Sequence, residues 1–548
     1  MKWHLVIFVL LAASVNATEW YVSPDGDDTN PGTLEQPFRT FYPAVTQAQP
    51  GDTIYVRGGV YTREHAMLER VLRSSGASSQ DDCDEGWYYL SGTCYYDRLA
   101  HIVIASQDDW RTRGRAFTVS AGTPSQPITI TAYPGETPYF DARETQGIYI
   151  DSQHWIIEGI TMRGSRIYFP RSGPPVPEHI TIRNNRLYDY GDGSNQGNVG
   201  MIKIDRGGAT NIFIHNNVIH DIYDEPDGSW DATINAQHFA AVTTLSSEAY
   251  EGIEAASTGY IEIINNTIFN VPQMVYFKNP AIGPIKIEGN TIYNAQSIGI
   301  WASSNIEFTR NLVYNVPRII NRGGGSGRSD PRIDERSSWN FTITDNTFVD
   351  ITGLTARGIQ GGHRIHGNVI TGFRDEYSHT GWGAERVLYM REETAAGFDD
   401  PNQSLLITWE VDNNCIVTQA HEPGYVRQQL ERNGFERNDY THAQAQEIFG
   451  FGVHDVLITG QDPLSPFVNP QAHDYRIQQG HPCEGFGANR APRVRGDLTG
   501  DGLVTLQDLL LLVDQLGRQA PPGDPADLNE DGIIDLFDLV IVARMIGN

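Results

Sequence analysis

The sequence predicts an all-β solenoid, a right-handed parallel β-helix, with a small α-helical module at its C-terminus. A unit consisting of an alternating apolar segment, an Asn and a second short apolar segment recurs between residues 180 and 418. Its period of two is typical of strands rather than helices, and its short spacings match those of solenoid repeats. After residue 496 the composition changes, and two acidic segments are each followed by an apolar helical segment.

The Asn residue sets the period of this unit. IEIINNTIFN (261–270) and IKIEGNTIYN (285–294) are two copies, and their Asn residues Asn266 and Asn290 are 24 residues apart. Asn tolerates left-handed backbone geometry and bonds to nearby backbone groups, so we expect it at the bend between two strands, with Asn side chains of successive coils bonded to one another. A β-sandwich also has regular short strands, but it gives no Asn-marked period of this kind. The complete set is Asn185, Asn217, Asn266, Asn290, Asn311, Asn346, Asn368 and Asn414.

Residues 1–17 have the pattern of a secretory signal peptide. Lys2 precedes the apolar segment 5–13, and a small-residue cleavage site ends at Ala17. No later apolar segment reaches the length of a membrane span. We therefore expect an extracellular, secreted protein without a membrane span, free or attached to the cell surface.

The four cysteines fit an exported protein, in which disulfides persist. We expect Cys83 to pair with Cys94 and Cys415 with Cys483, although the sequence alone leaves the connectivity open. The net charge of −28 argues against nucleic acid and anionic membranes as partners. It is compatible with an acidic substrate, because a local basic strip or a bound calcium ion dominates at short range.

Four segments follow one another along the chain. After the signal peptide we expect a β-helix domain at 18–490, a linker at 491–496 and a second domain at 497–548. Thr53–Val56 begins the first coil, and an amphipathic segment before it forms a short helix that caps the open end, as solenoids require. This opening resembles that of many secreted β-helix proteins.

The second domain contains two twelve-residue loops, DLTGDGLVTLQD (497–508) and DLNEDGIIDLFD (527–538). Each has oxygen donors at positions 1, 3, 5, 9 and 12 and Gly at position 6, which is the spacing of an EF-hand calcium loop. Position 7 contributes its backbone carbonyl. The predicted calcium ligands are Asp497, Thr499, Asp501, Leu503, Thr505 and Asp508, and Asp527, Asn529, Asp531, Ile533, Asp535 and Asp538.

These loops resemble those of a dockerin, because the entering helix is missing and position 12 is Asp rather than Glu. The resemblance implies two Ca²⁺ ions and a cohesin-type scaffold or cell-surface protein as partner. Positions 10 and 11 are Leu506-Gln507 and Leu536-Phe537, where cellulosomal dockerins commonly carry small hydroxyl residues. A non-cellulosomal cohesin and cell-surface retention both stay open.

The strands that follow the Asn bends present a second column of interest. Alternation places Phe277 and Ile300 toward the interior, and Tyr276, Lys278 and Trp301 outward. We align GMIKIDR (200–206), QHFAAVT (237–243), MVYFKNP (274–280), GIWASS (299–304), IINRGG (319–324) and RGIQGG (357–362). This alignment predicts that Lys203, Asp205, Arg206 and His238 lie on neighbouring coils.

A cationic and aromatic face on a β-helix resembles the polysaccharide lyases that share this fold. Such enzymes abstract the C5 proton of a uronic acid and expel the 4-linked sugar, with the carboxylate neutralised by calcium or Arg. The resemblance stops at fold and groove character, so the roles are our assignment. Lys278 is the candidate base, His238 or Tyr276 its helper, and Arg206 faces the uronate; Lys203, Asn279 and Trp301 are the candidate substrate-binding residues.

An acidic turn, DIYDEPDGSWD (221–231), is a candidate site for a further calcium ion in the groove. Its candidate ligands are Asp221, Asp224, Glu225, Asp227 and Asp231. Each of these assignments has a plainer alternative: a solvated strand Lys for Lys278, a structural His for His238, and an ordinary acidic loop for the turn.

Two other functions remain open at this stage. A glycoside hydrolase needs paired carboxylates, for which Asp205 with Asp221 or Asp231 would serve. A non-catalytic carbohydrate-binding or surface protein would use Trp301 and Tyr276 as platforms for sugar rings. Neither composition nor spacing identifies the polysaccharide.

Overall fold

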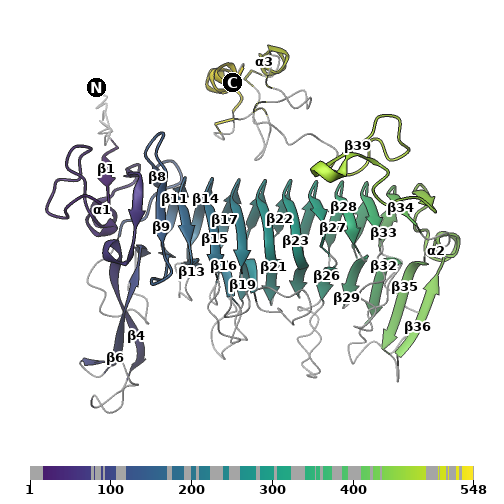
Figure 1. Cartoon of the computed structure of the whole chain (residues 1–548), viewed down its shortest axis with the longest axis horizontal. Coiled ribbons are helices and arrows are strands. Elements are labelled where there is room, and N and C mark those ends of the chain that lie inside the picture. The colour runs from purple at the N-terminus through teal and green to yellow at the C-terminus, as the bar shows by residue number, and fades with distance from the viewer. Residues whose placement is uncertain are drawn as a thin grey trace, which may run out of the picture. The chain divides into compact units, whose positions relative to one another are not determined.

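A computed structural model of the chain describes residues 17–75, 79, 88–90, 93–105, 119–169, 176–190, 199–204, 209–222, 239–245, 259–278, 284–301, 305–316, 318–322, 340–351, 353–357, 362–372, 386–392, 409–419, 424–431, 435–488, 496, 504, 506–513, 516–517, 526, 528–529 and 533–546. The chain forms two compact units, residues 1–262 with 270–283, and residues 263–269 with 284–548. Both are built from the same three-strand coil of a right-handed parallel β-helix (Figure 1). The predicted fold class is confirmed.

The first strand of each coil pairs in parallel with its counterparts in the coils before and after it. In the first unit these strands are β1 (Glu19–Val22), β2 (Thr53–Val56), β8 (Ile128–Ala132), β11 (Gln153–Glu158), β14 (Glu178–Arg183) and β17 (Thr210–His215), and β20 (Ile261–Ile264) spans the unit boundary. In the second unit they are β22 (Ile285–Glu288), β24 (Ile306–Thr309), β27 (Phe341–Thr344), β30 (Arg364–His366) and β33 (Glu410–Asp412).

The second and third strands of the coils belong to another parallel sheet. The second strands are β3 (Gly59–Tyr61), β9 (Pro138–Asp141), β12 (Thr161–Arg163), β15 (Arg186–Tyr190) and β18 (Val218–Ile222) in the first unit, and β25 (Leu312–Tyr314), β28 (Thr347–Ile351), β31 (Val369–Gly372), β34 (Cys415–Thr418) and β37 (Val456–Thr459) in the second. The third strands are β7 (Ile102–Ala105), β10 (Ile148–Asp151), β13 (Ile167–Phe169), β16 (Val199–Ile204) and β19 (Phe239–Leu245), then β26 (Arg318–Arg322), β29 (Leu354–Arg357), β32 (Arg386–Glu392) and β35 (Gly424–Glu431). Two long strands, β21 (Thr267–Lys278) and β23 (Thr291–Trp301), contain both the second and the third strand of their coils.

The repeated Asn residues form a buried ladder. In the second unit, the Asn290 side-chain amide donates to Asn311 Oδ1 at 2.9 Å and to the Ile263 carbonyl at 2.8 Å. Asn311 bonds in the same way to Asn346, and the described part of the ladder continues through Asn368 and Asn414. In the first unit, Asn185 bonds to Asn217. All eight Asn residues are at most 2% exposed, so each bend satisfies its buried backbone groups with one side chain from the neighbouring coil.

The left-handed residue of each bend is the one before the ladder Asn, and not that Asn itself. Asn184 and Asn265 have φ of +56° and +54°, Arg310 has +54° and Asp345 has +56°. Gly289 has +66° at the same position. The expected role of the ladder Asn is therefore divided: one residue makes the turn, and the next makes the bonds.

The interior of the coils is filled by aliphatic side chains. In β14, Ile180 and Ile182 are fully buried, whereas Thr181 and Arg183 between and after them are partly exposed. At the N-terminal end, α1 (Phe41–Gln47) begins at the N-cap Thr40. Its Phe41 ring lies 5.7 Å from that of Phe140, so the helix supplies apolar side chains to the first coils.

Additional elements extend from the coils. The N-terminal part has the short 3-10 helix η1 (Arg63–His65) and a three-stranded antiparallel sheet of β4 (Met67–Ser75), β6 (Thr93–Ala100) and β5 (Tyr88–Leu90). Toward the C-terminal end, β36 (Phe435–Tyr440) pairs antiparallel with β35, followed by α2 (His442–Phe449). Then β38 (Phe467–Asn469), the 3-10 helix η6 (Pro470–Ala472) and β39 (Asp474–Ile477) form a small antiparallel hairpin.

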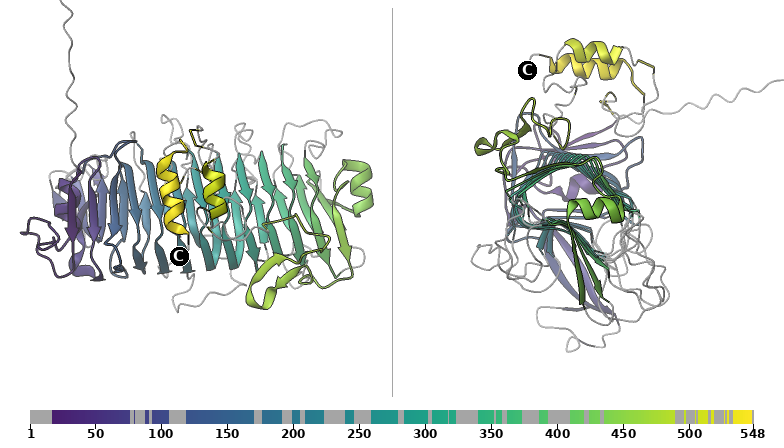
Figure 2. Two further views of the ribbon diagram at one scale, coloured as in Figure 1. Left: turned by 90° about the horizontal axis from the view of Figure 1, so that it is seen from above. Right: turned by 90° about the vertical axis from the view of Figure 1, so that its right-hand side faces the viewer.

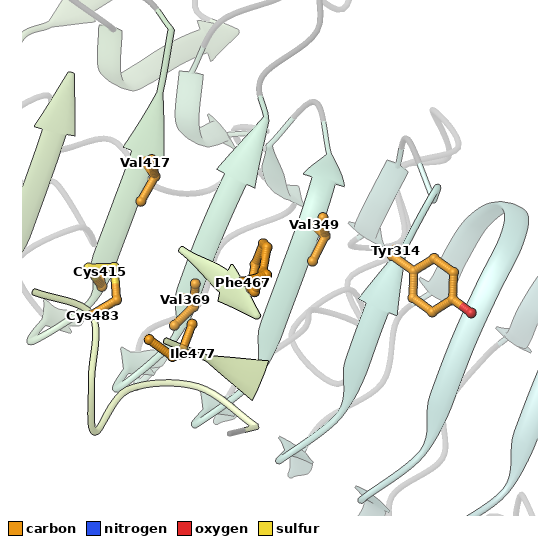
Figure 3. Close-up of a cluster of buried hydrophobic side chains, with 8 residues drawn as sticks. All are labelled: Tyr314, Val349, Val369, Cys415, Val417, Phe467, Ile477 and Cys483. Atoms are coloured by element: carbon orange, nitrogen blue, oxygen red, sulfur yellow. A yellow bond between two sulfur atoms is a disulfide. The ribbon is translucent and has the colours of Figure 1, made fainter. Parts of the chain in front are cut away.

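This hairpin covers the outward face of the second strands in the second unit (Figure 3). Phe467 and Ile477 from the hairpin pack in one buried cluster with Tyr314, Val349, Val369 and Val417. A disulfide between Cys415 and Cys483 ties the segment to β34, which confirms this predicted pair. Cys83 lies outside the described residues.

The C-terminal helices are α3 (Leu506–Val513) and α4 (Leu536–Met545), which lie side by side (Figure 2). Leu512, Leu528, Ile534 and Val542 form their buried core. No helix within the described residues is long and apolar enough to cross a membrane. Of the predicted signal peptide, only Ala17 lies within them.

Candidate functional site

The outward face of the third strands in the first unit brings aromatic and cationic side chains together. The register aligns Tyr149 with Tyr168, and Tyr168 with Lys203. The Lys203 ammonium lies 5.8 Å from the centre of the Tyr168 ring, and the Arg166 guanidinium lies 4.9 Å from it. Arg166 also donates to the Tyr190 hydroxyl at 3.2 Å. Two half-buried cations thus share one aromatic ring, a contact that stabilises both by cation–π attraction.

The same register continues to two of the predicted residues. Lys203 aligns with Thr243 in β19, and Thr243 aligns with Tyr276 in β21. Lys203 and Tyr276 therefore occupy one register column, with one coil between them. Lys278 lies two residues beyond Tyr276, at the position aligned with Leu245.

The strand that follows His238 in the sequence, β19, pairs with β16 of Lys203, so these two coils are neighbours as predicted, but their register differs from the sequence alignment. Phe239, the first residue of β19, pairs with Val199, whereas the alignment set it beside Ile202. Thr243 takes the place opposite Lys203, five residues after His238. The loops before and after the third strands differ in length, so motif matching shifted this segment. His238, Arg206 and Asn279 themselves lie outside the described residues.

Asp221, the first residue of the acidic turn, has a structural role. Its two carboxylate oxygens accept hydrogen bonds from His220 Nδ1 at 2.8 Å and from the Asn270 side-chain amide at 2.9 Å. Its φ of +55° places it at the bend that leaves β18. The other proposed ligands of the groove calcium, Asp224, Glu225, Asp227 and Asp231, lie outside the described residues, as does Asp205 of the hydrolase alternative.

In the second unit, the third strands align three arginines that sequence analysis did not single out. Trp301 in β23 pairs with Arg322 in β26, Arg322 with Arg357 in β29, and Arg357 with Arg391 in β32. The buried residues Ile298, Ile319, Leu354 and Leu388 hold the register three positions earlier. The sequence alignment matched IINRGG to RGIQGG and so shifted Arg357 by three residues. Aligning the buried aliphatic residues instead would have revealed the column.

Charges on the outward face of the first strands have a different arrangement. Arg183 pairs with Glu158 on the adjacent coil, and His215 Nε2 lies 2.9 Å from a carboxylate oxygen of Glu262. Glu288 pairs with Arg310 on the adjacent coil. On this face, neighbouring coils present charges of opposite sign.

In the second of the predicted calcium loops, the structure shows the hydrogen bonds of Asp538. The fully buried Asp538 carboxylate accepts hydrogen bonds from the backbone N–H groups of Leu528 at 2.7 Å, Asn529 at 3.1 Å and Asp535 at 2.8 Å. Asp508, its counterpart in the first loop, is also fully buried. Burying a carboxylate is costly without a neutralising partner, and the donor set of carboxylate, amide and carbonyl oxygens fits Ca²⁺.

Only part of each loop can be placed. Asn529, Ile533, Asp535 and Asp538 are described in the second loop, and Asp508 in the first. Within the described residues no group of three acidic, His or Cys side chains forms a metal cluster. The remaining predicted ligands, Asp497, Thr499, Asp501, Leu503, Thr505, Asp527 and Asp531, lie outside them.

An apolar surface adjoins the second loop. Leu536 and Phe537, at loop positions 10 and 11, are 70% and 69% exposed, and Val540 one turn further along α4 is 46% exposed. Large exposed apolar side chains grouped in this way mark interaction surfaces.

Comparison with known families agrees with both parts of this description. Residues 20–258 match the family described as Pel9A-like, right handed beta helix region, and residues 495–547 match the Dockerin type I domain. The first match covers the N-terminal part of the β-helix, and the second covers the C-terminal module. The module predicted from the calcium loops is thereby confirmed as a dockerin.

Individual relatives match over short segments. The chain is 48% identical over 73 residues to pectate lyase PEL9 of Emericella nidulans, covering 13% of this chain and 17% of that protein. It is 42% identical over 60 residues to the uncharacterized protein YwoF of Bacillus subtilis, covering 11% and 12%. The matches thus span less than a fifth of these relatives. The crystal structure of pectate lyase Pel9A superposes with a TM-score of 0.38 and 13% identity, covering 64% of this chain and 75% of that one.

Proposed function

We propose that residues 18–490 form a secreted polysaccharide lyase that cleaves a uronate-containing polysaccharide by β-elimination. The observation that carries this proposal is the match of residues 20–258 to the Pel9A-like β-helix region. The identity to a pectate lyase over 73 residues supports it. The contact between Lys203 and Tyr168, which gives the third strands a cationic and aromatic face, also supports it.

The proposed reaction assigns a task to each candidate residue. Lys278, in its neutral form, removes the C5 proton of a uronate, and the electron pair of that C–H bond forms the C4=C5 double bond. The C4–O bond breaks, and the leaving sugar oxygen takes up a proton, for which Tyr276 or His238 is the candidate donor. Arg206 stabilises the carboxylate as charge develops on it. Lys203, Asn279 and Trp301 hold the flanking sugars.

Calcium in the groove is a separate part of the proposal. A bound ion would neutralise the uronate carboxylate. The site would be formed by Asp221, whose two oxygens also accept hydrogen bonds from His220 and Asn270, together with Asp224, Glu225, Asp227 and Asp231. Arginine and calcium are alternative ways to neutralise the same carboxylate.

The test is a panel of polygalacturonate, alginate, ulvan and glycosaminoglycan, assayed for ultraviolet absorbance of the new double bond and for reducing ends. We expect absorbance to grow with one polymer and to be lost in Lys278→Ala, because general base catalysis contributes about 10²–10⁴-fold. Thermal melting controls for folding. New reducing ends without absorbance would indicate a hydrolase instead. Binding of a polymer with neither absorbance nor new reducing ends would indicate a carbohydrate-binding protein.

We further propose that the dockerin binds two Ca²⁺ ions and anchors the enzyme to a cohesin-type scaffold or surface protein. The exposed Leu536, Phe537 and Val540 favour an apolar contact with that partner. Calorimetric titration of the full chain and of a chain ending at residue 490 should differ by two bound Ca²⁺. The Asp538→Ala substitution in the full chain should remove one of these two Ca²⁺ ions. If the substituted full chain still binds two more Ca²⁺ than the shortened chain, Asp538 is not a ligand.

A further inference from the structure

The third strands of the second unit hold three arginines at one register position, Arg322, Arg357 and Arg391, which we call the arginine row. We propose that the arginine row binds carboxylates of a polyuronate chain that lies across the strands. This inference rests on the proposed function for the class of substrate, but it concerns binding and not the chemical step.

The first argument is electrostatic. Adjacent strands lie about 4.8 Å apart, and like charges directly opposite each other on neighbouring strands are destabilising. A chain with 40 basic and 68 acidic residues could easily place opposite charges there. It does so on the first strands of the same unit, where Arg364 in β30 pairs with Glu410 in β33 on the adjacent coil. Three arginines in consecutive register positions are therefore an arrangement that a polyanion would stabilise.

The second argument is geometric. The register pairs Arg322 with Arg357 and Arg357 with Arg391 without a shift, so the three positions form a straight line across the strands. A polyuronate carries one carboxylate on every sugar, so a chain that lies across the strands presents several carboxylates to the row. The planar guanidinium group matches the two oxygens of a carboxylate. A small dicarboxylic acid would use at most two of the three positions.

The third argument is the residue at the start of the row. Trp301 occupies the register position opposite Arg322 on the preceding coil. Indole is the largest aromatic surface among side chains, and aromatic rings pack against the C–H faces of sugar rings. The order Trp, Arg, Arg, Arg along one column suits an acidic carbohydrate better than inorganic phosphate or an acidic peptide.

The experiment compares two triple variants of the full chain with equal net charge. R322Q/R357Q/R391Q removes the row, and R143Q/R364Q/R476Q removes three arginines whose side chains are 55%, 49% and 59% exposed and each pair with a nearby acid. Affinity electrophoresis in gels containing polygalacturonate, alginate or a neutral polysaccharide measures binding without requiring catalysis. Thermal melting of each variant checks the fold.

We expect each single row substitution to weaken binding to one acidic polymer by about three- to tenfold, the range of a charge-assisted bond at a partly exposed site. The row triple should lose most of the salt-sensitive affinity, and the control triple should bind as the wild type does. Oligouronates of increasing length should gain affinity until they span the row, and Arg391→Gln should remove the gain made by the longest ones.

Two results would overturn the proposal: equal losses of binding in the two triples, or wild-type binding by a folded row triple. If the row triple fails to fold, the Arg→Lys triple replaces it, because Lys keeps the charge but lacks the bidentate geometry. We expect that variant to fold and to bind several-fold more weakly than wild type. Binding that depends on the row but is not accompanied by β-elimination would refute the proposed lyase activity and support the arginine row as a binding site. β-Elimination with binding that does not depend on the row would refute the arginine row as a binding site and support the lyase activity.

Discussion

Within the second unit, the second and third strands of each coil carry contrasting outward faces. The face of the second strands is apolar: Tyr314 stacks on Tyr293 with ring centres 4.8 Å apart, and the β38–β39 hairpin covers Tyr314 and its neighbours. The third strands carry the arginine row at one register position. The hairpin covers the face of the second strands, whereas the third strands carry arginines on successive coils. From this contrast we expect the covered face to contribute stability and the third strands to contribute binding.

Breaking the cover should therefore lower stability without changing binding. The disulfide between Cys415 and Cys483 spans 68 residues, for which chain entropy gives about 4 kcal/mol of stabilisation. We expect C415A/C483A to lower the free energy of unfolding by about this amount, measured by denaturant titration. The double substitution avoids leaving a buried thiol unpaired.

The control for this prediction is polymer binding by the folded variant at low temperature. Unchanged affinity would support the separation of the two faces. Affinity that falls together with stability would show that the covered face contributes to binding as well.

The sequence was a better guide to the bends than to the faces. The ladder Asn could be predicted because one residue type recurs in a local motif and each copy makes the same buried bonds. The residue that turns the chain was missed because Asn, Gly, Arg and Asp all occupy that position. A left-handed conformation is accessible to several residue types, whereas the ladder needs an amide.

The faces could not be predicted because their register depends on connections of varying length. Lys203 and Thr243 are opposite each other, 40 residues apart, whereas Arg322 and Arg357 are separated by 35. No local motif determines these sequence separations. The register is determined instead by the buried aliphatic residues, which align from coil to coil. The calcium loops were simple by comparison, because their ligands follow one another within twelve residues.

The second prediction compares the buried ladder with an exposed one. In Asn290→Ala, the backbone N–H of Asn266 and the Ile263 carbonyl both lose their partner, Asn290. Each orphaned buried group costs about 1–3 kcal/mol, so we expect a loss of about 3 kcal/mol in the free energy of unfolding. Catalytic activity and polymer binding per folded molecule should not change.

The matched control is Asn315→Gly. Asn315 donates to Asn294 Oδ1 at 2.7 Å in an exposed ladder, and its φ is +53°. Gly removes the amide and adopts this conformation without steric cost, so the loss should stay below about 1 kcal/mol. Equal losses for the two variants would show that burial does not distinguish the ladders.

The smallest effect is expected where the ladder ends. Asn414 donates through its backbone N–H to Asp455 Oδ1 at 2.7 Å, and the Tyr425 hydroxyl donates to the other oxygen. Burial raises the pKa of Asp455 above its usual range, with the charge of Asp412 adding to the effect, while the bonds from Tyr425 and Asn414 and the nearby His442 oppose it. The ladder therefore terminates on a carboxylate that burial disfavours in its charged form.

The sign of the pH dependence follows from this raised pKa. Between the unfolded and the folded pKa values, the folded state binds more protons, so stability falls as pH rises through that acidic window and is constant above it. Asp455→Asn mimics the protonated acid: its carbonyl oxygen still accepts from Asn414, and it carries no charge. We expect this variant to be slightly more stable than wild type at neutral pH and equally stable at low pH, measured by denaturant titration across pH. Parallel stability profiles for the two proteins would show instead that the bonds from Tyr425 and Asn414 fully compensate the burial of the carboxylate.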